Sequence, residues 1–378
     1  MNKKLMIIAG EASGDLHGAS LIRELKTIDP EIKVYGIGGD RMIAQGMTAL
    51  YNIRQMAFLG FVEVIRHLPF IKKVQHDLIA KINSENINTI VLIDYPGFNL
   101  DIAKKLHAMN KKLIYYISPQ VWAWGKGRIK KIKEIIDKML VVFPFEETMY
   151  KENGVDALYV GHPLIEHIEN YNFLLKEELY KKFDLEVSKE ILLLMPGSRK
   201  QEIKKIFPAC IEAAEKLAAD FNMQVVVACA ENIDEKFFYE HTDKNNFKIV
   251  KGFTYDLLKH SRFGIVKSGT STLEAGVFQM PFIVVYSTTA LTYFIGKMLV
   301  KIKNIAMANI ILGETVIDEL IQNDVNVSNI YVKASRVLLD KDLYAEIKKK
   351  LGGIKAKLGG AGASKRAAEI IHAELNEA

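Results

Sequence analysis

The glycine-bounded segment GEASGDLHG, residues 10–18, gathers chemically active side chains directly after the apolar run LMIIA of residues 5–9. Carboxylates and an imidazole can transfer protons in general acid–base catalysis. The glycines permit a tight turn, and the amides that open a following helix attract anions. A helix cap would explain one polar residue here, but not two carboxylates and an imidazole together. The polar side chains are Glu11, Ser13, Asp15 and His17, of which Ser13 and Asp15 are the candidates for a cap.

A second loop, LIDYPGFN of residues 92–99, places a single carboxylate at the end of an apolar run. Asp94 ends the run, and Pro96 and Gly97 then turn the chain. A carboxylate at such a position can be a general base or can bind the amides of the turn, and the residues alone favour neither role.

Two loops in the second half of the chain have the composition of phosphate-binding turns. MPGSRKQE, residues 195–202, contains an arginine suited to bidentate phosphate binding. KSGTSTLEAG, residues 267–276, puts hydroxyl groups and amides at a predicted helix N-terminus, which suits a diphosphate. Glu274 could accept hydrogen bonds from ribose hydroxyls or close a capping box with Ser271. The candidate residues are Gly197, Ser198, Arg199, Ser268, Gly269, Thr270, Ser271 and Glu274.

The loop SPQVWAWG, residues 118–125, contains both tryptophans of the chain, Trp122 and Trp124. Tryptophans at this spacing serve as packing residues or as a binding platform. Residues 104–138 around them carry ten Lys or Arg and two acids. Such a basic stretch is either a solvated surface or a site for an anionic partner, such as nucleic acid, phospholipid or a phosphorylated substrate.

Composition and charge narrow the class of protein. The 378 residues suggest two domains, and 49% hydrophobic with 25% charged residues is typical of a globular protein. Cys210 and Cys229 have neither disulfide nor zinc-site spacing, and the pair Asp340 and Asp342 is interpreted as helix capping, so we expect no metal or cofactor. No apolar run is long enough to cross a membrane, and no signal peptide is evident, which predicts a cytoplasmic protein.

The apolar runs alternate with helical patterns twice along the chain. This alternation predicts parallel sheets covered by helices on both faces. We therefore expect an α/β fold with two doubly wound, Rossmann-like domains facing a central cleft. The expected domains are an acceptor-side domain over residues 1–165, a donor-binding domain over 166–345, and C-terminal helices over 346–378 that return to the first domain. We also expect Pro208 to kink or delay a helix and the glycines after residue 351 to interrupt the last helices.

Taken in order, these motifs resemble the lipid-A-disaccharide synthase family, inverting glycosyltransferases with the GT-B fold. The resemblance covers nearly the whole chain and is carried by GEASGDLHGA, GDRM, LGFVEV, IDYPGFN, SPQVWAW, FPFE, VGHPL, MPGSR, SGTSTLEA and AMANIILGE. One departure concerns Gly97, where the family often has a second aspartate. Asp94 is therefore the only carboxylate of its loop.

The resemblance implies a reaction. UDP-2,3-diacylglucosamine is the expected donor, 2,3-diacylglucosamine 1-phosphate the acceptor, and the β-1′,6-linked disaccharide 1-phosphate and UDP the products. It implies Asp94 as the general base, with Glu11 and His17 as alternatives. Asn309 is expected to face the donor, and Ser13, Asp15, Trp122 and Trp124 to line the acceptor side. Without a metal, helix-N-terminal amides and Arg199 would stabilise the departing diphosphate.

The acylated substrates also suggest a membrane contact. In FLGFVEVIRHLPFIKKV, residues 58–74, apolar side chains recur at helical spacing beside basic ones, and Pro69 is expected to end or kink the helix. We expect this face to bind the anionic inner surface of the inner membrane, although packing on the core is the alternative. The face consists of Phe58, Phe61, Val62, Ile65 and Leu68, and residues 291–304 are a second candidate. A homodimer is compatible with these expectations.

Three other activities fit parts of the sequence. Another GT-B enzyme acting on UDP-N-acetylglucosamine, an epimerase or a lipid II-type transferase, would keep the fold and change the chemistry. A nicotinamide dehydrogenase is disfavoured because YGIGGDRM, residues 35–42, has Arg41 where the dinucleotide fingerprint needs a third glycine. A non-enzymatic RNA or membrane binder would use the basic stretch, but no nucleic-acid partner is expected.

Overall fold

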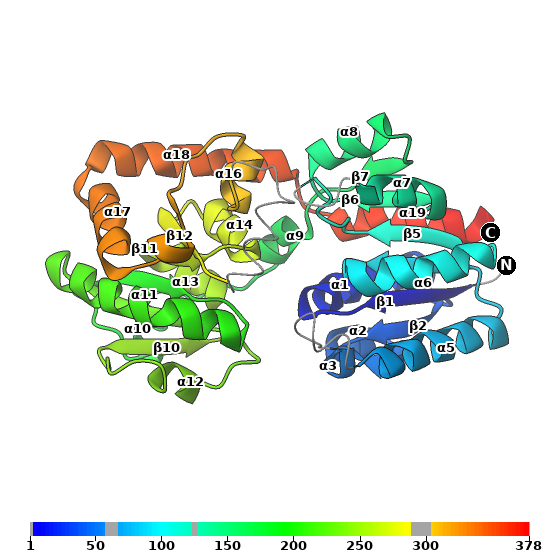
Figure 1. Cartoon of the computed structure of the whole chain (residues 1–378), viewed down its shortest axis with the longest axis horizontal. Helices are drawn as coiled ribbons and strands as arrows, with labels where there is room; N and C mark the ends of the chain where they lie inside the picture. Colours follow the sequence, from blue (N-terminus) through cyan, green and yellow to red (C-terminus); the bar gives the residue numbers. More distant parts are fainter. Residues whose placement is uncertain (1–2, 57–66, 123–126, 289–303, 378) are drawn as a thin grey trace. The chain divides into compact units, whose positions relative to one another are not determined.

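The computed structural model describes residues 3–56, 67–122, 127–288 and 304–377. They form two compact units (Figure 1). The first unit contains the chain up to Glu166 and again from Leu358, and the second contains His167–Lys357. The expected boundary at residue 345 lies inside helix α18 (Lys341–Leu358).

The first unit is built on a parallel seven-stranded sheet in the order β3-β2-β1-β4-β5-β6-β7. After their first residues, the central strands β1, β4 and β5 are apolar and buried, because helices cover both faces of the sheet. The strands are β1 (Lys4–Ala9), β2 (Lys33–Gly38), β3 (Met47–Asn52), β4 (Thr89–Ile93), β5 (Lys112–Tyr116), β6 (Lys138–Val141) and β7 (Ala157–Tyr159). The helices are α1 (Ala12–Ile28), α2 (Asp40–Ala44), α3 (Ile53–Met56), α5 (Leu68–Ser84), α6 (Pro96–Ala108), α7 (Gly127–Ile135), α8 (Pro144–Glu152), α9 (Pro163–Glu169), which crosses into the second unit, and α19 (Ala363–Glu377).

The second unit repeats this plan with a parallel six-stranded sheet in the order β10-β9-β8-β11-β12-β13. The strands are β8 (Glu190–Met195), β9 (Met223–Cys229), β10 (Phe247–Lys251), β11 (Ser261–Lys267), β12 (Phe282–Tyr286) and β13 (Glu319–Ile321). The helices are α10 (Lys176–Lys182), α11 (Lys200–Asp220), α12 (Lys236–Tyr239), α13 (Thr254–His260), α14 (Thr270–Val277), α16 (Met307–Leu312), the 3₁₀ helix η1 (Gln322–Asp324), α17 (Val327–Leu339) and α18. The predicted pair of doubly wound α/β sheets is confirmed.

Some local expectations for prolines and glycines were wrong. Pro69 lies in the first turn of α5, where its missing amide costs nothing. The helix that Pro69 was expected to end or kink would begin at residue 58, and residues 57–66 lie outside the described residues, so that expectation stays a prediction. Pro208 lies inside α11, which begins eight residues earlier, so this proline does not delay the start of the helix. Helix α18 continues through Gly352 and Gly353, because Leu351 and Ile354 on the same helix are fully buried and packing outweighs the propensity of glycine. The later glycines, at positions 359, 360 and 362, separate α18 from the last helix as expected.

The last helix returns to the first unit and packs against α1. Glu374 of α19 forms ion pairs with Lys112 and Lys138, which begin β5 and β6. Asp340 accepts hydrogen bonds from the amides of residues 342 and 343, so it caps α18 as expected.

Candidate active site

In each sheet the strand order reverses direction between two neighbouring strands. The motif loops directly follow these two strands. In the first unit β1 and β4 are neighbours, and they lead into GEASGDLHG and LIDYPGFN. In the second unit β8 and β11 are neighbours, and they lead into MPGSR and KSGTST. Ligands of open α/β sheets bind at the carboxyl ends of the strands beside such a reversal. All four loops therefore lie where ligands of open α/β sheets bind.

The backbone of Asp94 is fixed in an unusual conformation at the end of β4. Asp94 and Tyr95 are consecutive non-glycine residues with φ of 44° and 49°. Three hydrogen bonds hold the backbone of Asp94: its carbonyl accepts from Tyr115 Oη at 2.6 Å and from Asn99 Nδ2 at 2.7 Å, and its amide donates to the Tyr116 carbonyl at 3.2 Å. Each left-handed residue costs roughly 1–3 kcal/mol, and such conformations cluster at functional sites.

The surroundings of Asp94 change its acidity. Burial and the nearby charge of Glu11 raise the pKa of Asp94 to about 6, although a hydrogen bond from the backbone of Tyr95 opposes the rise. The carboxyl group is only partly accessible to solvent. A carboxylate with a pKa near the working pH suits general base catalysis, because it is deprotonated in use and still basic enough to take a proton. Asp94 therefore has the environment expected of a general base.

Gly10 allows the two first-unit loops to approach each other. A Cβ atom at Gly10 would lie 2.2 Å from Cδ1 of Tyr95, so only glycine fits beneath that ring. Tyr95 also donates a hydrogen bond from Oη to the Met56 carbonyl at 3.3 Å. The ring thereby connects the loop after β1 with the loop that carries Asp94.

The other polar residues of the first loop have different environments. Asp15 is buried, and its carboxylate accepts hydrogen bonds from the amides of Gly39 at 2.7 Å and Met42 at 3.1 Å, at the start of α2. It therefore stabilises the N-terminus of α2, and neither Asp15 nor Ser13 is the N-cap of α1, which is Glu11. Glu11 and Ser13 are exposed, and His17 is partly buried one turn further along α1.

The loop after β8 presents an arginine beside a shared carboxylate. Gly197 has φ of 100°, which favours glycine, and Arg199 is the exposed N-cap residue of α11. Glu202 lies 3.5 Å from the Arg199 guanidinium and 3.0 Å from Nζ of Lys267, the last residue of β11. Sequence reasoning missed Lys267 and Glu202, although Lys267 is the first residue of the motif KSGTSTLEAG. Two cations sharing one carboxylate leave positive charge at the ends of β8 and β11.

The loop after β11 opens α14 with a glycine. Gly269 is the N-cap residue with φ of 145°, and Ser268 donates a hydrogen bond to the Ile305 carbonyl at 3.0 Å. The capping box between Ser271 and Glu274 does not exist, because the helix begins at Thr270. Burial raises the pKa of Glu274 to about 7, although part of the side chain reaches solvent.

Asn309 has no hydrogen-bonding capacity left for a ligand. Its amide nitrogen donates to the Ile317 carbonyl at 2.9 Å and to Glu319 Oε1 at 2.8 Å. Its oxygen accepts from the amides of residues 316 and 317. The side chain is fully buried. Contrary to the expectation that it faces the donor, Asn309 holds the segment 316–319 against the start of α16.

Some expected site residues lie outside the described residues, namely Trp124, Phe58, Phe61, Val62 and Ile65. Leu68 opens α5 and is 43% exposed. Trp122 is described and donates a hydrogen bond from Nε1 to Oε1 of the buried Glu146 at 3.0 Å. Glu146 belongs to FPFE, so the two motifs are in contact.

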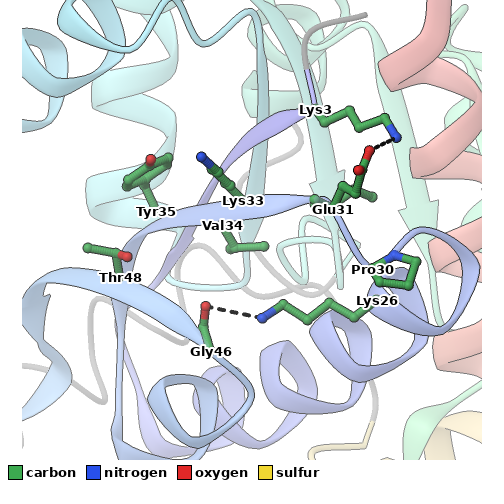
Figure 2. A pocket seen from close by; sticks show the side chains of 10 residues that line it. Lys3, Lys26, Pro30, Glu31, Lys33, Val34, Tyr35, Gly46 and Thr48 are labelled. Carbon is green, nitrogen blue, oxygen red and sulfur yellow. Dashed lines mark hydrogen bonds and ion pairs between the residues drawn. The ribbon is translucent and has the colours of Figure 1, made fainter.

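A separate pocket lies at the opposite edge of the first sheet (Figure 2). Its lining includes Lys33, the first residue of β2, and Lys3, just before β1. Lys3 pairs with Glu31 and Lys26 donates to the Gly46 carbonyl, so these amines already have partners. Because the pocket is at the amino ends of the strands, it lies at the other edge of the sheet from the two loops of the first unit.

Neither a metal cluster nor a membrane span occurs in the described part of the chain. Within it, no group of three or more His, Cys, Asp or Glu side chains is arranged to hold a metal ion. In the same residues, no helix has the length and apolar character needed to traverse a bilayer. Both cysteines are buried free thiols.

Comparison with known families gives one match over nearly the whole chain. The family model described as lipid-A-disaccharide synthetase matches residues 5–373. A lipid-A-disaccharide synthase from Geobacter metallireducens is 36% identical over 373 residues, which cover 98% of this chain and 97% of the relative. One from Syntrophus aciditrophicus is 38% identical and covers 97% of both chains.

Solved structures with the same fold include nucleotide-sugar enzymes. A UDP-GlcNAc 2-epimerase from Neisseria meningitidis, bound to UDP-GlcNAc, has a TM-score of 0.68 at 13% identity and covers 98% of this chain and 100% of its own. The calicheamicin glycosyltransferase CalG4 has a TM-score of 0.64 at 14% identity, and the match covers 100% of this chain and 99% of CalG4. At these identities the likeness shows the fold alone.

Proposed function

This chain belongs to the lipid-A-disaccharide synthetase family, and we propose that it joins UDP-2,3-diacylglucosamine to 2,3-diacylglucosamine 1-phosphate with inversion. It is a glycosyltransferase of lipid A biosynthesis. The resemblance inferred from the motifs is thereby confirmed. The family match favours this activity over an epimerase or a lipid II-type transferase, with which the chain shares only the fold.

The observation that carries the proposed mechanism is the environment of Asp94. Its carboxylate takes the proton of the acceptor 6-hydroxyl while that oxygen attacks the anomeric carbon of the donor. The bond from the anomeric carbon to the diphosphate breaks as the new bond forms, and UDP leaves with the electron pair. One displacement of this kind inverts the anomeric centre. Glu11 raises the basicity of Asp94 by its charge, and Glu11 and His17 remain the alternative bases.

The second unit supplies the stabilisation of the leaving group. Arg199 and Lys267 provide positive charge at the ends of β8 and β11, and the N-terminus of α14 provides amides. Charge that develops on the departing UDP is stabilised by such preorganised groups. Glu274 is placed one turn into α14, where a ribose hydroxyl is its proposed partner.

Membrane binding is the second part of the proposal, since both substrates carry acyl chains. In the first unit, α6 and α7 pack together and expose basic side chains. They are Lys104, Lys105, Lys130, Lys131 and Lys133. Clustered cationic side chains favour an anionic bilayer surface, so we place the enzyme at the inner face of the inner membrane. A homodimer remains a prediction for light scattering.

The test of the reaction is incubation with both substrates and mass spectrometry of the lipids. The expected product is the disaccharide 1-phosphate, with stoichiometric UDP. A matched reaction with UDP-N-acetylglucosamine alone detects epimerisation. Epimerised sugar without disaccharide would overturn the proposal.

Membrane binding is tested by co-sedimentation with vesicles of anionic or zwitterionic phospholipid, at low and high salt. We expect the wild type to sediment with anionic vesicles at low salt, and Phe61→Ser/Ile65→Ser to sediment less. A wild type that ignores anionic vesicles at low salt would refute the membrane proposal and leave the reaction untouched.

A further inference from the structure

The loop after β5 ends against a buried carboxylate that the proposed mechanism does not use. Glu146, in the first turn of α8, is 1% exposed. Its Oε1 accepts hydrogen bonds from Ser118 Oγ at 2.7 Å and from Trp122 Nε1 at 3.0 Å. Its Oε2 accepts from the amide of Phe143 at 3.3 Å. One carboxylate thus collects donors from two loops, and burying it is costly unless those bonds are made.

These hydrogen bonds fix the loop beside the strand that carries Asp94. Strand β5 is the neighbour of β4, and Tyr115 and Tyr116 of β5 hold the backbone of Asp94. The chain then runs directly into Ser118 and Trp122. Glu146 therefore determines where the loop lies next to the proposed general base.

Trp122 has one constrained edge and one accessible surface. Its indole nitrogen is held by Glu146, while the side chain remains partly exposed. It packs edge-on against Phe145, with ring centroids 5.4 Å apart, and Phe145 is 37% exposed. Aromatic rings held at one end by a hydrogen bond and open at the other are suited to contact a ligand that is partly apolar. The carboxyl edge of this sheet is where such a ligand binds.

We propose that Glu146 is a positioning residue for the acceptor: it orients Trp122, and the indole ring contacts the acylated sugar phosphate beside Asp94. This inference rests on the proposed function. Removing one hydrogen bond of the network loosens Trp122 without touching the donor site of the second unit. Loosening Trp122 therefore weakens acceptor binding alone. If Glu146 had a merely structural role, its loss would lower activity towards both substrates together.

The proton state of Glu146 gives a second readout. Burial raises the pKa of Glu146 to about 7, although its hydrogen bonds from Ser118 and Trp122 oppose the rise. Protonation at lower pH removes an acceptor from a group that faces three donors, so it weakens the hold on Trp122. The other titratable groups nearby are Tyr150 on α8 and His162, whose ring is 5.1 Å from that of Phe143.

The experiment compares Glu146→Gln with Glu147→Gln, a neighbour on α8 that pairs with Lys151 near the surface. Glutamine keeps one oxygen but presents an amide donor toward the donors of the site. We expect Glu146→Gln to raise the KM for the acceptor about tenfold, as for loss of one hydrogen bond to a charged group, and to leave the KM for the donor unchanged. Glu147→Gln behaves as the wild type.

Intrinsic fluorescence provides the second measurement, because Trp122 and Trp124 are the only tryptophans of the chain. The emission of the wild type should titrate near pH 7. That of Glu146→Gln, which retains His162 and Tyr150, should not, while Glu147→Gln titrates normally. An unchanged titration together with an unchanged acceptor KM in Glu146→Gln would overturn the inference.

A third variant covers the case in which Glu146→Gln does not fold. Trp122→Phe keeps an aromatic ring and removes only the indole N–H group and part of the ring. It should also raise the acceptor KM selectively, and a wild-type KM would overturn the inference. Failure of the wild type to make disaccharide from the two substrates would instead refute the proposed function, so the two failures are distinguishable.

Discussion

Replacing Asp94 by asparagine should abolish turnover and stabilise the protein at the same time. The side chain keeps its shape, and the backbone hydrogen bonds at residue 94 do not involve the carboxyl group. Losing a general base typically costs ~10²–10⁴ in rate. UDP affinity should be unchanged, because the proposed diphosphate groups belong to the other unit.

The stability effect follows from the raised pKa. The native state binds the proton of Asp94 more tightly than the unfolded chain does, because the pKa of Asp94 is about 6 in the native state and 3.8 in the unfolded chain. Ionisation of Asp94 therefore destabilises the native state as pH rises from about 4 to 6, and this loss of folding stability is complete above pH 6. A difference of two pKa units corresponds to at most about 3 kcal/mol, and asparagine escapes this cost. The advantage of the variant should be full at pH 7 and vanish below pH 4.

The assay pairs single-turnover kinetics with urea unfolding at pH 7 and pH 4. In the wild type, kcat/KM should rise with pH to a plateau above about 6. Glu11→Gln should move that midpoint below 6 but keep it well above 3.8, because burial is the larger cause of the shift. Near-normal turnover of Asp94→Asn would assign the base to Glu11 or His17. Lower stability of the variant than of the wild type at pH 7 would refute the argument from the raised pKa.

Three further predictions concern the supporting residues. Gly10→Ala should lower both stability and kcat, because the added Cβ would overlap the Tyr95 ring. In the control Gly97→Ala the added Cβ meets nothing within 4 Å, so this variant should match the wild type in thermal unfolding and activity assays. Lys267→Ala should weaken UDP binding in calorimetry by about tenfold and leave uridine binding unchanged; equal losses for both ligands would argue against a phosphate contact. Asn309→Ala should lower the unfolding free energy by roughly 1–3 kcal/mol, because buried partners lose their hydrogen bonds, and a neutral result would contradict the saturated geometry.

The strand-forming runs of the sequence determined the two sheets. Apolar runs such as those of β1 and β8 are buried on both faces, so burial alone forces parallel strands with covering helices. Strands β3 and β13 were not predicted. Both lie at sheet edges and mix polar with apolar residues, as MTALYN and ELI, so neither carries a continuous apolar signal. Edge strands are specified by their pairing partner more than by their own residues.

The candidate site was determined in part by the sequence. Loop composition after β1, β4, β8 and β11 was sufficient to identify Asp94 and Arg199 as candidates, because glycines and polar residues that directly follow buried strands are typical of ligand-binding loops. The sequence could not assign Asp15, whose carboxylate could cap its own helix or bind a ligand. Only the fold shows that its partners are the amides at the start of α2, 24 to 27 residues away.

Tertiary structure alone decided the remaining assignments, because they depend on contacts between distant residues. The pKa of Asp94 is a property of its burial and of its distance from Glu11, and neither can be read from a local pattern. Lys267 and Glu202 meet only because β8 and β11 are neighbours. Asn309 lies in a matching motif, yet its four hydrogen bonds are fixed by residues up to ten positions away. Sequence determined which chemical groups follow each strand, and the packing of the sheets decided which of those groups are free to react.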